Sequence, residues 1–386
     1  MALQEQLFES LTEGNDAETS KASIGPRNDV ERHLVDIWEQ VLGVHPVGVR
    51  DNFFDLGGHS LLAVTLFSEV KREFNISLPL SILFDAPTVE QLAHILLEQG
   101  KSVSWTSLVK IQAGGRKLPL YLISGAGGNV VRFRDLARYL GEDQPIFALQ
   151  PPGLDGEQTF MTSVEELSAH FIAEIRKDRP LGPYHLVGYS FGALVAFEMA
   201  RQLKTAGVEL GLVGLLDIAE WRYAEQLEGA RSFADRKASY LNRLRRLLSG
   251  ENRLSYLKRG MQKRMSMLFY RLAKSMRRPL PQSIGTIEDI NMFAALQYSP
   301  GCYEGRLTLL RTKLERENMD PQLGWGRIAN EVAVLEIPGD HDEITSEPHV
   351  QVLAAKLSAC LEENMLTIGK NWKNSSTSLN AVRKMN

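Results

Sequence analysis

The run YHLVGYSFGALV, residues 184–195, constrains the fold of this chain more than any other stretch. Its first half predicts a strand, its second half predicts a helix, and the G-x-S-x-G turn between them places Ser190 at the junction. So sharp a turn needs small residues on both sides, which Gly188 and Gly192 supply. It raises the serine hydroxyl above a sheet edge and directs helical N–H groups at an oxyanion. A glycine-rich structural turn is the alternative, but the strand-to-helix setting predicts a catalytic nucleophile.

Strands and helices alternate from Leu118 onward, which predicts a mostly parallel sheet. An edge strand at 106–111 precedes this alternation. The further strands are expected at 120–124, 146–150, 184–188, 212–217, 307–310 and 332–337. The helices are expected at about 130–140, 163–178, 191–206, 286–298 and 346–363.

The N-terminal quarter has a different, helical pattern. Residues 1–27 are polar, and an apolar stripe of helical spacing begins at 28–43 with Gly43 as its stop. Further helices are expected at 60–74, near 78–84 and at 88–99. The sequence therefore predicts a small all-α four-helix bundle at 28–99 and a linker at 100–105. At the other end, the polar residues 366–386 predict a disordered tail.

Composition limits the possible classes of function. The 386 residues carry a net charge of −3, which implies no bulk attraction to nucleic acid or to a membrane. The two cysteines, Cys302 and Cys360, predict no disulfide framework, and no C-x-x-C or H-x-x-x-H metal pattern occurs. The polar N-terminus has no apolar signal core, and no apolar run reaches the ~20 residues of a membrane span. We therefore expect a cytoplasmic protein without a metal site.

The bundle contains the segment DNFFDLGGHSL, residues 51–61. A helix-capping serine after a glycine turn is the structural interpretation of Ser60. The helix N-terminus also suits a phosphodiester. The long motif and its helical frame resemble the peptidyl carrier domains of nonribosomal peptide synthetases, with His59 typical of that class. The resemblance implies that a phosphopantetheinyl transferase attaches 4'-phosphopantetheine to Ser60, where the substrate is held as a thioester.

The larger part of the chain, about 106–365, resembles an α/β-hydrolase, and within that class the type I thioesterases that end nonribosomal peptide or hybrid polyketide assembly lines. The supporting segments are GYSFGALVAFEMA, GLLDI, YSPGCYEGRLTLLR and IPGDH. A carrier domain immediately upstream makes the resemblance more specific. It implies upstream synthetase modules as partners.

A serine nucleophile needs a neighbouring base. His341 follows a strand and the turn Pro338-Gly339-Asp340 near the end of the domain, where a hydrolase base belongs, and His349 is the alternative. The acid that orients the base is less obvious, because the strand 307–310 ends without a carboxylate. The resemblance implies Asp217, after the strand that follows the serine's helix, with Glu315 and Glu317 as alternatives.

An oxyanion needs two N–H donors. We expect the backbone of Phe191 to supply one and Ala126, in the loop Ser124–Gly128, the other. Many relatives carry His-Pro-x-x-Gly where this chain has Ser124-Gly125, and a plain glycine turn is the structural alternative.

Residues 219–285 form an insertion with apolar residues at helical spacing and many basic residues. The structural interpretation is a solvated helical hairpin. The functional one is a lid over the acyl channel, with Met261, Met265 and Leu268 on its apolar face and a basic face that could contact the carrier.

These predictions describe an enzyme that moves an acyl or peptidyl chain from the arm on Ser60 to Ser190 and releases it by hydrolysis or cyclisation. Two alternatives remain open. One is a general esterase or lipase fused to a carrier, and the other is a non-catalytic carrier and docking module.

Overall fold

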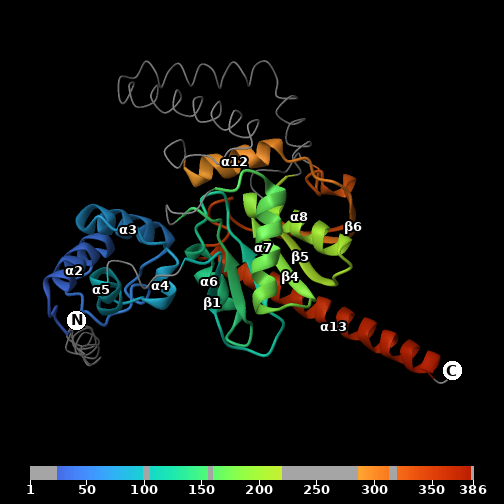
Figure 1. The fold of residues 1–386 in the computed structure, drawn as a ribbon, viewed down its shortest axis with the longest axis horizontal. Helices are drawn as coiled ribbons and strands as arrows, with labels where there is room; N and C mark the ends of the chain where they lie inside the picture. Colours follow the sequence, from blue (N-terminus) through green and yellow to red (C-terminus); the bar gives the residue numbers. More distant parts are fainter. Residues whose placement is uncertain (1–23, 99–104, 155–159, 220–285, 313–319, 384–386) are drawn as a thin grey trace, which may run out of the picture. The chain divides into compact units, whose positions relative to one another are not determined.

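In this computed structural model the described residues are 24–98, 105–154, 160–219, 286–312 and 320–383, with side chains described to 366. Contacts divide the chain into two compact units at Ser104/Trp105, and residues 79–81 group with the second unit. Each unit is described separately below (Figure 1).

The first unit is a bundle of helices. They are α2 (Asp29–Leu42), α3 (Ser60–Phe74), α4 (Ile82–Asp85) and α5 (Val89–Leu97). Side chains of Asn28 and Thr88 accept hydrogen bonds from helical N–H groups and so begin α2 and α5. Trp38 and Phe53 meet edge to face in the buried core, with ring centroids 5.4 Å apart. The predicted all-α carrier bundle is confirmed.

The second unit is a seven-stranded, mostly parallel sheet within the described residues, in the order β1-β3-β2-β4-β5-β6-β7. Only β1, at the edge, runs antiparallel to its neighbour. The strands are β1 (Leu108–Gln112), β2 (Leu120–Ile123), β3 (Ile146–Leu149), β4 (Tyr184–Tyr189), β5 (Leu210–Leu216), β6 (Tyr303–Thr312) and β7 (Ala329–Ile337).

Helices cover this sheet on both faces. α7 (Val164–Asp178) and α8 (Phe191–Thr205) pack together and lie in front of the sheet in Figure 1, with α12 (Ile287–Gln297) against them. α6 (Arg134–Leu140) and α13 (His349–Arg383) pack together, and α13 passes behind the sheet. Strands β2, β3 and β4 are buried at every position, as strands covered on both faces must be. The predicted α/β-hydrolase architecture is confirmed.

Several predicted boundaries differ from the structure, and two of the differences have a clear reason. β6 begins at Tyr303 instead of at 307, because Glu304 and Arg306 alternate with partly buried positions and break the apolar run on which the prediction rested. The sequence predicts a disordered tail at 366–386, whereas α13 continues to Arg383. The polar residues after 366 have no apolar period, so the sequence gave no sign of a helix there. The predicted lid lies outside the described residues except for Ala219.

Candidate active site

The carboxyl ends of three strands bring the predicted catalytic residues together. Ser190 follows β4, Asp217 follows β5, and His341 follows β7. Because these strands are parallel, their ends meet at one edge of the sheet, as in other open α/β folds that bind ligands there. The side chains that the sequence separates by up to 151 positions are thereby in hydrogen-bond contact.

Ser190 occupies the sharp turn that the sequence predicted. Its φ of 54° and ψ of −123° are a strained combination for a residue with a side chain. A Cβ added to Gly188 would lie 2.0 Å from the Gly192 carbonyl oxygen, and one added to Gly192 would lie 2.4 Å from Ile123 O and Ser124 O. Both glycines are therefore required by close backbone approach, and the strain holds the serine hydroxyl at the partly exposed edge.

The three side chains form a hydrogen-bonded series. His341 Nδ1 lies 2.8 Å from Asp217 Oδ2, and His341 Nε2 lies 3.0 Å from Ser190 Oγ. A carboxylate only accepts hydrogen bonds, so Nδ1 carries the imidazole proton and Nε2 is left to accept the serine proton. This is the arrangement in which a histidine acts as general base toward a serine.

Asp217 is held more firmly than its partners. It is 1% exposed, and its Oδ1 accepts hydrogen bonds from the Thr312 N–H at 2.8 Å and the Thr312 hydroxyl at 3.0 Å. The φ of Asp217 is 51°, so acid and nucleophile both sit in the left-handed region. Sequence analysis missed Thr312. The predicted strand ends at 310, where the sequence shows only the absence of a carboxylate. In the structure β6 extends to Thr312, which donates hydrogen bonds to Asp217, the acid that follows β5.

His349, the alternative base, is not in this contact. His349 is the first residue of α13, and its Nε2 lies 3.5 Å from Glu343 Oε2. Glu315 and Glu317 fall within 313–319, outside the described residues.

The expected oxyanion donors lie on the two segments that meet at the elbow. Phe191 is the first residue of α8, and Ala126 is in the loop after β2. The Asn291 side chain, from α12, donates a 2.7 Å hydrogen bond to Ala126 O and so holds that loop. Asn291 is 1% exposed and had no distinguishing signal in the sequence. The assignment of Phe191 and Ala126 as donors remains a prediction.

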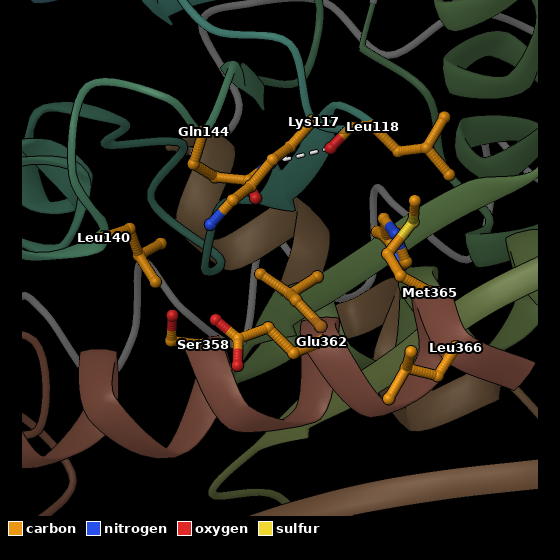
Figure 2. A pocket seen from close by; sticks show the side chains of 10 residues that line it. Lys117, Leu118, Leu140, Gln144, Ser358, Glu362, Met365 and Leu366 are labelled. Carbon is orange, nitrogen blue, oxygen red and sulfur yellow. Dashed lines mark hydrogen bonds between the residues drawn. The ribbon is translucent and has the colours of Figure 1, made fainter.

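A cavity of about 470 Å³ lies at the other end of the strands and takes no part in this site (Figure 2). His185 lines it from the start of β4, and Ser358, Glu362 and Met365 line it from α13. Burial, helped by the charge of Arg179, lowers the pKa of His185 to about 4, and its Nδ1 accepts the Leu212 N–H at 2.8 Å. His185 is therefore a neutral core residue, as its place in an apolar strand suggests.

Ser60 is the first residue of the 15-residue helix α3 in the other unit. Its hydroxyl makes no hydrogen bond with the described residues, and the N-cap position belongs to His59, whose side chain caps nothing. The serine is therefore not needed as a cap. A partly exposed hydroxyl at the positive end of a helix fits the attachment of a phosphodiester.

Comparison with known proteins agrees with both units. Residues 118–360 match the family model of the thioesterase domain, and residues 32–96 match that of the phosphopantetheine attachment site. Indigoidine synthase of Dickeya dadantii (strain 3937) is 44% identical over 187 residues, which are 48% of this chain and 12% of that protein. Chondramide synthase cmdD of Chondromyces crocatus is 30% identical over 377 residues, 88% of this chain and 9% of that protein.

Among solved structures, a holo four-domain nonribosomal peptide synthetase bound to AMP and glycine is similar with a TM-score of 0.52 and 27% identity. The match covers 89% of this chain and 27% of that one. This chain thus spans a small part of the length of these relatives. In the described part of the chain no helix is long and apolar enough to cross a membrane. With its serine, histidine and aspartate in one hydrogen-bonded series and its family match over most of the second unit, the chain belongs to the thioesterase family, and a carrier domain of the phosphopantetheine attachment-site family precedes its thioesterase domain.

Proposed function

We propose that this chain releases an acyl or peptidyl chain from its own carrier domain through an acyl-enzyme on Ser190. The observation that carries the proposal is the contact series from Asp217 through His341 to Ser190. The carrier domain upstream supports a thioester substrate over a simple ester. Relatives named as synthetases or synthases, one of them a dimodular nonribosomal peptide synthase, support upstream synthetase modules, with a phosphopantetheinyl transferase, as partners.

Phosphopantetheine on Ser60 supplies the thiol that holds the substrate as a thioester. His341 Nε2 removes the Ser190 proton, and Ser190 Oγ attacks the thioester carbonyl carbon. The N–H groups of Phe191 and Ala126 stabilise the negative oxygen. The carbon–sulfur bond then breaks, and His341 returns the proton to the departing thiolate.

The acyl-serine is released by a second nucleophile. His341 accepts a proton from water, or from an amine or hydroxyl of the bound chain, and that nucleophile attacks the acyl carbon. The bond between the acyl carbon and Ser190 Oγ then breaks, and His341 returns the proton to the serine oxygen. Water gives a carboxylic acid, and an internal group gives a lactam or lactone. An internal nucleophile competes well when water is excluded, because oriented groups reach effective molarities of roughly 10⁵ M or more.

Kinetics on synthetic acyl-pantetheine thioesters test this proposal. Ser190→Ala and His341→Ala should each lower kcat by several orders of magnitude, and the double variant little further, since the residues act as a unit. Labelling of the parent by a fluorophosphonate, absent in Ser190→Ala, identifies the nucleophile. Comparable kcat/KM on simple esters and on pantetheine thioesters would favour the general esterase.

A further inference from the structure

The ring of Tyr189, the residue before Ser190, lies between the loop of the base and the loop expected to bind the oxyanion. It is 3% exposed and stacks on the His341 imidazole, with centroids 5.1 Å apart and planes 26° apart. On the side of the oxyanion loop, a Cβ added to Gly125 would lie 3.1 Å from Tyr189 Cδ1. Both loops are therefore in close contact with one aromatic ring.

The Tyr189 hydroxyl fixes the backbone of the base. It donates a 2.9 Å hydrogen bond to the main-chain carbonyl of His341. Burial raises the pKa of Tyr189, although the charge of Arg132 opposes this, so the phenol remains protonated and able to donate near neutral pH. Ring stacking and this hydrogen bond together restrain both the side chain and the main chain of His341.

Arg132 holds Tyr189 in turn. Its guanidinium carbon lies 3.8 Å from the centre of the Tyr189 ring, within the range of a cation–π contact. Its Nη2 donates to the carbonyl of Asp342, the residue after His341, at 3.4 Å. One arginine thus contacts both the ring and the loop that the ring restrains.

We propose that Tyr189, held by Arg132, is a positioning residue. Its ring and hydroxyl orient the His341 imidazole toward Ser190, and its ring also supports the 124–128 loop beside these two residues. The inference rests on the proposed function. It assigns to these two residues no contact with substrate. Its consequence is that loss of the Tyr189 hydroxyl lowers turnover without weakening substrate binding.

The test uses the full chain with Tyr189→Phe, which removes the hydroxyl and keeps the ring. We expect kcat on an acyl-pantetheine thioester to fall roughly 3- to 10-fold, the worth of one hydrogen bond, with KM within twofold of the parent. Tyr303→Phe is the matched control, because Tyr303 is a buried tyrosine at the amino end of β6, away from the site. It should leave kcat unchanged.

Arg132 is tested by two variants. Arg132→Met should lower kcat by a similar factor, and Arg132→Lys, which keeps a cation within reach of the ring, should restore part of the loss. The proton NMR signal of His341 Nδ1–H should be sharp in the parent and in Tyr303→Phe. It should broaden or vanish in folded Tyr189→Phe, because the imidazole is then less firmly held.

Parent-like kcat and a sharp Nδ1–H signal in Tyr189→Phe would overturn the inference while the fluorophosphonate labelling of Ser190 kept the proposed function intact. A parent that is not labelled would overturn both. A fall in kcat that Tyr303→Phe shares, and that follows the folded fraction, would reduce Tyr189 to a stability role and also overturn the inference.

Discussion

At the scale of single residues, Asp217 depends on donors that its own strand does not supply. Thr312 gives its Oδ1 two hydrogen bonds, and His341 gives its Oδ2 a third. A buried carboxylate with several donors is firmly oriented, and the orientation passes to the imidazole that it contacts. The position of the base is therefore fixed from two directions, by Asp217 at its ring and by Tyr189 at its backbone.

Asp217→Asn tests the orientation of the base. The amide oxygen can still accept from Thr312, but the amide nitrogen cannot accept from His341 Nδ1–H, so the imidazole takes the wrong tautomer. We expect kcat to fall by roughly 10³- to 10⁴-fold, measured on an acyl-pantetheine thioester. Asp135→Asn, on α6, is the control and should keep parent activity. Near-parent turnover in Asp217→Asn would move the acid elsewhere.

Thr312→Val tests the support of the acid. It removes the hydroxyl that lies 3.0 Å from Asp217 Oδ1 and keeps the main-chain donor. We expect kcat to fall roughly 3- to 10-fold, because one donor to that oxygen is lost. Thr308→Val removes a buried threonine hydroxyl from the same strand and should leave kcat unchanged. Equal effects of the two variants would show that the strand and not the hydrogen bond matters.

The sequence predicted those site residues that lie in a recognisable short motif or at a characteristic position after a strand. Ser190 stands in a motif, and His341 follows a strand and a glycine turn at the position of a hydrolase base. Thr312, Tyr189, Arg132 and Asn291 have no such signature, because their roles arise from contacts between strands and helices far apart in the sequence. Residues of these types are common at strand ends and helix starts, and only tertiary packing gives them a part in the site.

At the scale of elements, β4 has a reactive residue after its carboxyl end and a buried structural histidine near its amino end. Ser190 follows its carboxyl end, while His185, near its amino end, is 1% exposed with its Nδ1 bonded to the β5 backbone. The strand and the start of α8 were predicted to within a residue because the apolar run is continuous. The end of α13 was not, because the polar residues after 363 carry no hydrophobic period.

The His185 site predicts a loss of stability in mild acid. Its pKa is about 4 in the folded state, against an ordinary 6.5, so below pH 6.5 the unfolded chain binds a proton that the folded chain does not. Stability should therefore fall as pH drops from 6.5 to 4, by up to about 3 kcal/mol, and the contribution should level off below 4. Hydrogen exchange of the β4 and β5 amides measures this. His185→Asn should flatten the dependence and His349→Asn should not, and an unchanged slope in His185→Asn would contradict the assignment.

The elbow makes a second prediction at this scale. Gly192→Ala would place a Cβ 2.4 Å from two carbonyl oxygens of the β2 end, so the strand or the helix must shift. We expect at least a 100-fold loss of kcat/KM together with a lower melting temperature, since a 1 Å misplacement costs about 10² in rate. Gly301→Ala is the control, because its nearest neighbour would be a flexible arginine side chain at 3.6 Å. A fully active Gly192→Ala enzyme would mean that the close approach is not required.

At the scale of the whole molecule, one chain contains a carrier domain and a thioesterase domain. The order of the two domains and both folds were predictable, because each has a long, specific motif at a helix start. The chemistry of the released product was not, since the residues expected to line an acyl channel, 219–285, carry only a general pattern of apolar and basic positions. Residues 220–285 lie outside the described residues, and their role as a lid remains a prediction.

In the proposed mechanism the acyl or peptidyl substrate moves from the arm on Ser60 to the hydroxyl of Ser190 before it is released. A phosphopantetheinyl transferase is used to load an acyl-pantetheine group onto the intact protein, and the mass of the protein is followed over time. In the parent the acyl mass should disappear and leave the bare arm, while in Ser190→Ala it should persist on the Ser60 peptide. Ser60→Ala should take no arm but still cleave free acyl-pantetheine. Equal rates of acyl loss in the parent and in Ser190→Ala would contradict the account.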